Sequence, residues 1–257
     1  MIEAMQNALQ STAALLVLIT VAHVPCRVDA DEIPRRTDDR PNFIVFFTDD
    51  QGYNDVGCYG APLIETPHFD QMACEGTRFT SFYAQNVCGP SRAALLTGCY
   101  PIRCGEPANH KNPHTVLHPQ EWTLAEVLQR AGYATACIGK WHVAGNGNIR
   151  GSDDGTFTYA TLQPPVGEGP FLPELMPNAQ GFDYFLGTPM HNGTTRQPHP
   201  PQEYVTQLRR NGEVVEPNVD LNTLTKRYTE ESIRFLRANK DRPFFLYLAH
   251  TMPHVAL

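Results

Sequence analysis

Positive charge is scarce in this sequence, which has 20 lysines and arginines against 27 aspartates and glutamates and a formal net charge of −7. A basic surface of the kind that binds nucleic acid is therefore not expected. The overall field also opposes an anionic substrate, so local positive charge would have to hold such a substrate in place.

Cysteine is sparse as well, with 7 residues in 257, and no two of them form a Cys-x-x-Cys pair. This spacing argues against a structural zinc site or a thioredoxin-like motif. The number is also too small for a disulfide scaffold. A bridge between Cys99 and Cys104 is possible but not required.

Long apolar runs are missing, and the run from Ala13 to Ala22 is too short to span a bilayer comfortably. Small residues follow it at Val28-Asp29-Ala30, as a signal peptidase requires. We therefore expect an export signal over residues 1–30, a periplasmic or secreted protein, and no stable membrane association. No Lys or Arg precedes the run, so an apolar N-terminal helix and a misassigned start are the alternatives. Residues 31–40 form a polar tether.

Apolar runs at residues 43–47 and 244–249 predict strands that are buried on both faces of a sheet. A third strand is predicted over residues 133–138. The stretch from Ala144 to Gln202 is rich in Gly and Pro and is expected to form loops over the body of the domain.

Helices are predicted between these strands. Thr66-Pro67 marks the start of one that Gly76 closes. Thr123 and Glu126 form a capping box for another, and its apolar face is expected to contain Leu124, Val127, Leu128 and Ala131. A long amphipathic helix is marked by Leu221, Leu224, Tyr228, Phe235 and Leu236. Alternating helices and apolar strands predict an α/β fold with a largely parallel sheet.

Polar residues follow three of the predicted strands, where ligands bind in parallel sheets. They are Asp49 and Asp50, Lys140 with His142, and His254. Each has an ordinary alternative, such as a turn, a surface charge or a hydrogen-bonded bystander. Their expected convergence at one edge of the sheet is what favours a functional site.

A further cluster is Cys88-Gly89-Pro90-Ser91-Arg92, which precedes Ala93-Ala94-Leu95-Leu96-Thr97-Gly98. Pro90 fits a first helical turn, so Cys88 is expected at a helix N-terminus, where free N–H groups favour an anion. Arg92 lies one turn along and offers a planar cation for a tetrahedral oxyanion. Taken alone, Cys88 could equally be a reactive or a buried structural cysteine.

The string Cys-x-Pro-Ser-Arg followed by Leu-Thr-Gly resembles the signature of the type I sulfatases of the alkaline-phosphatase-like superfamily. The resemblance extends from Pro41 to the end of the chain, in ordered blocks. They are Pro41-Asn42-Phe43-Ile44-Val45 with Asp49-Asp50, Gly139-Lys140-Trp141-His142, Gly181-Phe182-Asp183, and Pro243-Phe244-Phe245 leading to Pro253-His254. It implies an alkaline-phosphatase-like sandwich with a largely parallel mixed sheet flanked by helices, with residues 41–257 as the N-terminal part of the catalytic domain.

The resemblance also implies a mechanism. Cys88 would be oxidised by a formylglycine-generating enzyme to Cα-formylglycine, whose hydrated aldehyde attacks sulfur and later releases sulfate. Asp49 and Asp50 would bind Ca²⁺, or Mg²⁺, together with residue 88. Arg92 and Lys140 would stabilise the developing charge. His142 would take the proton of the second hydroxyl, and His254, with His250 as its competitor, would contact the sulfate.

The family pattern places an Asp-Asn pair, a second lysine and a smaller subdomain downstream of His254, where only Val255-Ala256-Leu257 remain. We therefore expect a fold that is incomplete at the C-terminus, with weak metal binding, impaired turnover and an exposed sheet edge or core face. The implied substrate is a sulfated small molecule or carbohydrate. The alternatives are a phosphodiesterase or phosphonate monoester hydrolase of the same superfamily, and an inactive vestigial or binding fragment.

Overall fold

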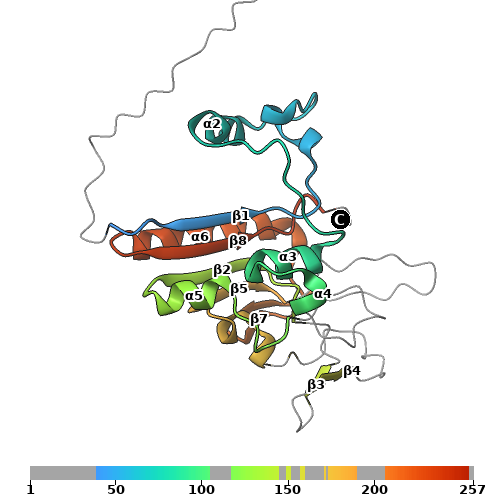
Figure 1. Cartoon of the computed structure of the whole chain (residues 1–257), viewed down its shortest axis with the longest axis vertical. Coiled ribbons are helices and arrows are strands. Elements are labelled where there is room, and N and C mark those ends of the chain that lie inside the picture. The colour runs from blue at the N-terminus through green and yellow to red at the C-terminus, as the bar shows by residue number, and fades with distance from the viewer. Residues whose placement is uncertain are drawn as a thin grey trace, which may run out of the picture.

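The computed structural model describes residues 39–104, 117–144, 149–151, 157–159, 171, 173–189 and 206–254 (Figure 1). The predicted signal over residues 1–30 and nearly all of the tether lie outside these residues. Within them, no helix is long and apolar enough to cross a membrane.

A mixed six-stranded sheet forms the centre of the molecule, in the order β1-β8-β2-β5-β6-β7 (Figure 1). The pairings among β1, β8, β2 and β5 are parallel. β6 pairs antiparallel with β5, and β7 pairs antiparallel with β6. The prediction of a largely parallel sheet is therefore confirmed. The strands are β1 (Phe43–Phe47), β2 (Ala134–Lys140), β5 (Tyr184–Thr188), β6 (Leu208–Arg210), β7 (Glu213–Glu216) and β8 (Phe244–Ala249), and β3 (Ile149–Gly151) and β4 (Phe157–Tyr159) pair separately.

Helices cover both faces of the central strands. Alternate residues of β2 and β8 point to opposite faces, so Ile138 and Leu248 pack with α6 (Leu224–Asn239), while Cys137 and Tyr247 pack with α3 (Cys88–Thr97) and α5 (Leu124–Arg130). This double coverage explains why both strands are fully buried and why the residues of β8 are almost all apolar. The remaining helices are α2 (Pro67–Glu75), α4 (Pro101–Cys104) and the 3-10 turns η2 (Tyr53–Asp55), η3 (Gly57–Tyr59), η5 (Pro173–Leu175), η6 (Pro177–Ala179) and η7 (Leu221–Thr223).

Strand β1 occurs where predicted, but its expected burial on both faces is wrong. It lies at the end of the sheet order, and Phe43, Ile44 and Phe46 are 41%, 53% and 47% exposed. The edge strand meets α2 through an edge-on contact between Phe46 and Phe69, whose ring centroids are 5.7 Å apart. Apolarity predicted the strand correctly, but it carries no information on which strand ends the sheet.

The expectation that residues 144–202 form only loops is also wrong, because β5 lies in this stretch and pairs with β2. The two strands approach closely at their glycines. A Cβ on Gly187 would lie 1.7 Å from the carbonyl oxygen of Gly139, and a Cβ on Gly139 would lie 1.8 Å from that of Ala249. The backbones of three neighbouring strands therefore meet at Gly139, directly before Lys140.

The sequence signals for the start and end of α5 are confirmed. Thr123 and Glu126 form the predicted capping box, and Gly132 takes the left-handed conformation after the helix, with φ of 81°. The predicted apolar face is partly wrong, because Leu124 and Val127 are 38% and 51% exposed, whereas Ala125 is buried. Cys99 and Cys104 are free thiols, so the optional bridge is not formed.

Candidate active site

Cys88 is the first residue of α3 and is half-buried. Val87 before it is extended, and Pro90 fits the first turn because its missing N–H would have no helical partner there. The hydroxyl of Ser91 accepts a hydrogen bond from the amide of Gln85 and donates to the carbonyl of Val87, at 3.0 and 2.8 Å. Ser91 therefore fastens the incoming chain to the helix start and fixes the place of Cys88.

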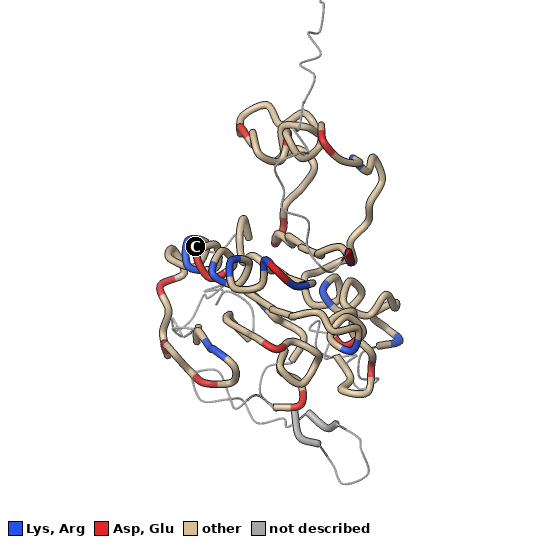
Figure 2. Tube along the Cα trace, turned by 90° about the vertical axis from the view of Figure 1, so that its left-hand side faces the viewer, with Lys and Arg blue, Asp and Glu red and all other residues tan. Residues whose placement is uncertain are grey.

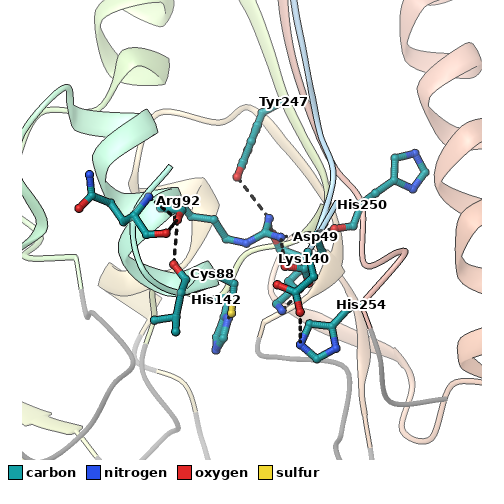
Figure 3. Close-up of polar contacts among 12 residues, drawn as sticks. Asp49, Cys88, Arg92, Lys140, His142, Tyr247, His250 and His254 are labelled. Atoms are coloured by element: carbon teal, nitrogen blue, oxygen red, sulfur yellow. Dashed lines mark hydrogen bonds and ion pairs between the residues drawn. The ribbon is translucent and has the colours of Figure 1, made fainter. Parts of the chain in front are cut away.

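The sulfur of Cys88 lies 3.2 Å from Nδ1 of His142. Figure 3 shows the two side chains next to each other. His142 follows β2 with a φ of 59°, which is uncommon for a residue with a side chain. Its amide donates to the carbonyl of Pro189 at 2.9 Å, which holds this backbone turn in place. The pairing joins two predicted site residues that are 54 positions apart in the chain.

Arg92 is completely buried one turn after Cys88. Its Nη1 donates to the carbonyl of Lys140 at 2.9 Å and to the hydroxyl of Tyr247 at 3.3 Å, and its Nη2 donates to the carbonyl of His250 at 3.4 Å (Figure 3). Burial on its own lowers the pKa of Arg92, but Tyr247 and Asp49 outweigh burial and raise it. The guanidinium is therefore a fixed positive charge.

Asp49 is 2% exposed and is shared by two buried cations. Its Oδ2 lies 2.6 Å from Nζ of Lys140, and its Oδ1 lies 3.4 Å from Nη2 of Arg92. Two cations against this carboxylate leave a net positive charge among the three buried side chains, and the half-exposed Asp50 beside them carries a further negative charge. Elsewhere in the described residues, acidic and basic positions are interspersed along the body of the molecule (Figure 2). The local charge that the sequence called for is therefore present.

The two candidate histidines after β8, His250 and His254, lie in different surroundings. Nε2 of His254 lies 3.5 Å from Oδ2 of Asp50, at the edge of the cluster. The ring of His250 points away and packs against Phe46 and Tyr228, with centroids 4.8 and 6.3 Å apart (Figure 3). Burial lowers the pKa of His250. The geometry thus favours His254 over His250 for contact with a substrate.

A cavity of about 700 Å³ opens beside the cluster and is lined by Asp49, Asp50 and Cys88, among others. Carboxylate oxygens are the donors that hard cations such as Ca²⁺ prefer, so the two aspartates fit such an ion in kind. The described residues contain no group of three or more His, Cys, Asp or Glu side chains arranged to hold a metal. Asp49 and Asp50 alone would therefore supply only part of a coordination shell.

Tyr247 is the residue at this site that the sequence did not single out. It lies inside the apolar strand β8 and is fully buried, which made it look like an ordinary core residue. Its position as a hydroxyl-bearing residue in an otherwise apolar run, two residues from the strand end, was the available signal.

The sequence model of the family described as Sulfatase matches residues 41–257, which is most of this chain. The chain belongs to the sulfatase family. Human arylsulfatase G is 34% identical over 246 residues, covering 85% of this sulfatase chain and 42% of that protein. Canine N-acetylgalactosamine-6-sulfatase is 34% identical over 239 residues, covering 83% and 40%. The sulfatase chain thus spans about two-fifths of the length of these relatives.

Solved structures agree with the predicted alkaline-phosphatase-like fold. The crystal structure of Ps i-CgsB in complex with k-i-k-neocarrahexaose has a TM-score of 0.61 and 31% identity, covering 84% of this sulfatase chain and 46% of that one. The phosphonate monoester hydrolase of Agrobacterium radiobacter has a TM-score of 0.51 and 23% identity. At that identity the likeness concerns the fold alone.

Proposed function

We propose that this protein hydrolyses sulfuric esters with a formylglycine made from Cys88 and a divalent cation. The observation that carries the proposal is the placement of Cys88, at the start of α3 with its sulfur 3.2 Å from His142, beside the buried cluster of Arg92, Asp49 and Lys140. Membership in the sulfatase family supports the same reaction class.

Each side chain has a role that follows from its position. Arg92 and Lys140 are fully buried cations, and their charge offsets the charge that develops on the oxygens of the anionic group. His142 is placed to accept a proton from residue 88, because Nδ1 lies within hydrogen-bond distance of that side chain. His254, held against Asp50, is placed at the edge of the cluster, where the leaving alcohol would lie.

Formylglycine would supply a hydrated aldehyde as the nucleophile, and the sulfur of Cys88 marks its place. Asp49 and Asp50 would hold the cation, with residue 88 as a further ligand, and the ion would supply Lewis-acid polarisation of a sulfate oxygen. Lys140 and Arg92 already contact both oxygens of Asp49. Cation binding must therefore compete with these ion pairs, so we propose that Ca²⁺ or Mg²⁺ binds weakly to the chain described here.

We propose a sulfated carbohydrate or small molecule as the substrate. One relative is named as an N-acetylgalactosamine-6-sulfatase, and one structural neighbour was solved with k-i-k-neocarrahexaose. Export through the segment at residues 1–30 and modification by a formylglycine-generating enzyme complete the proposal.

Coexpression of the protein with a formylglycine-generating enzyme tests the proposal. Intact-mass analysis should show conversion of Cys88, and the product should hydrolyse an aryl sulfate in preference to an aryl phosphate. Cys88→Ala should abolish turnover, whereas Cys99→Ala should not, because Cys99 is exposed and contributes nothing to the cluster. Chelation should remove activity, and added Ca²⁺ should restore it.

Two outcomes would contradict the proposal. A strong preference for the phosphate ester would favour a phosphodiesterase or phosphonate monoester hydrolase. An unmodified Cys88, in a host that modifies a known sulfatase in parallel, would favour a protein without this catalytic activity.

A further inference from the structure

The guanidinium of Arg92 has an ordered set of partners. Each of its terminal nitrogens faces one backbone carbonyl and one side-chain oxygen: Nη1 meets Lys140 and Tyr247, and Nη2 meets His250 and Asp49. The buried Nε has no hydrogen-bond partner among the residues that the structure describes. Because no described residue accepts a hydrogen bond from Nε, the orientation of the guanidinium depends on the four contacts of its terminal nitrogens.

The two side-chain partners differ in charge. Asp49 is an anion that Lys140 also contacts, at 2.6 Å. Tyr247 is a neutral phenol, because burial raises its pKa to about 12. A second carboxylate at this position would cancel the positive charge that an anionic substrate needs. A phenol orients the guanidinium and leaves that charge in place.

The rest of the Tyr247 side chain is anchored independently of its hydroxyl. Its ring is stacked with that of Phe182, at a centroid distance of 6.3 Å, and lies at the same distance from the ring of Phe47. Phe47 in turn lies under the guanidinium of Arg92, 5.3 Å from its carbon. Removal of the hydroxyl should therefore leave the ring where it is.

We propose that Tyr247 is a positioning residue, whose hydroxyl fixes the buried guanidinium of Arg92 so that its charge favours a sulfate group in the adjacent cavity, without adding charge to the site. The inference rests on the proposed function, since it assigns Arg92 to the substrate's anionic group. Tyr247 acts through Arg92 and need not touch the substrate.

Inorganic sulfate is the probe, and calorimetric titration of the protein with it measures binding without requiring turnover. Tyr247→Phe is expected to weaken the affinity about tenfold, because a guanidinium that lacks this hydrogen bond no longer keeps its charge fixed beside the sulfate. On the matured enzyme, kcat/KM for an aryl sulfate should fall by a similar factor. Tyr184→Phe is the matched control, because its hydroxyl hydrogen-bonds Glu231, which lies on α6, on the opposite face of the sheet.

A double-mutant cycle separates positioning from a general loss of structure. In an Arg92→Lys background, which has no planar fork to orient, Tyr247→Phe should cause no further loss of sulfate affinity. Unchanged affinity in Tyr247→Phe, an equal loss in Tyr184→Phe, or an additive loss in the double variant would overturn the inference. If sulfate binding follows the expected pattern but no sulfate ester is hydrolysed, the hydrolase proposal fails and the positioning role stands.

Discussion

Lys140 and Asp49 form a buried ion pair of 2.6 Å across the carboxyl ends of two strands that are not adjacent, with β8 between them. The pair joins residues 91 positions apart in the sequence, and Arg92 adds a second cation to the same carboxylate. Asp49 is thus the counterion of the whole cluster.

Removal of Asp49 should therefore cost more stability than removal of Lys140. Asp49→Asn leaves two buried cations without a counterion, whereas Lys140→Met leaves Asp49 paired with Arg92. A buried ion pair that loses one partner costs about 3–5 kcal/mol, and we expect Asp49→Asn at the upper end of that range and Lys140→Met at or below its lower end. Urea unfolding of the metal-free protein measures both.

The half-exposed pair of Arg227 and Glu216 provides the control, since its oxygen and nitrogen also lie 2.6 Å apart. Arg227→Ala should cost less than about 1 kcal/mol, because solvent screens the pair. Equal costs for Asp49→Asn and Arg227→Ala would show that Asp49 is not the counterion of the cluster.

The contact between Cys88 and His142 predicts thiol reactivity in protein expressed without a formylglycine-generating enzyme. The imidazole lies 3.2 Å from the thiol sulfur and can accept its proton as the sulfur attacks the reagent. His142→Ala should slow the alkylation of Cys88 by iodoacetamide near neutral pH about tenfold, as followed by peptide-level mass spectrometry. His254→Ala should leave the rate unchanged, because His254 contacts Asp50 instead. A slower reaction only in His254→Ala would reverse these two assignments.

His250 predicts a loss of stability in acid. Burial lowers its pKa in the folded protein, so the unfolded chain binds the proton more readily. The free energy of unfolding should be highest above the unfolded pKa of about 6.5 and should fall as pH drops below it. His250→Phe, which keeps a ring beside Phe46, should reduce the dependence of the free energy of unfolding on pH. Denaturant titrations above and below a pH of about 6.5 measure this dependence.

The matched variant is His68→Phe, on the exposed surface of α2. It should keep the wild-type dependence of stability on pH. An unchanged slope in His250→Phe would mean that other groups cause the acid sensitivity.

Much of the site could be predicted because its residues follow strands whose apolar character is plain in the sequence. β2 and β8 are buried on both faces, so the apolar run of β8 and the mainly apolar segment of β2 identified them, which placed Lys140 at the end of β2 and His254 beyond the end of β8. β5 could not be found this way, since its close approach to Gly139 is a tertiary contact that favours Gly187 rather than a β-branched residue. The bond between Tyr247 and Arg92 joins residues 155 positions apart, and no local pattern encodes it.

The exposed edge of β1 predicts self-association. Phe43, Ile44 and Phe46 present apolar surface on a strand that has a partner on one side only among the described strands. Ile44→Lys should raise the monomer fraction in analytical ultracentrifugation, because charge on an edge strand disfavours pairing with another chain. Stability should change by less than about 0.5 kcal/mol. Leu63→Lys adds the same charge at a residue that is 91% exposed and off the sheet, and it should not alter association.

The meeting of three strand backbones at Gly139 limits how this enzyme family member could diversify. Side chains larger than hydrogen are excluded at Gly139 and Gly187 by carbonyl oxygens that cannot move without breaking the sheet. The position of Lys140 along the sheet is therefore fixed relative to the end of β8. Selection for altered ligand binding should therefore accept few changes along these strands and should find useful variation in the segments that surround the cavity.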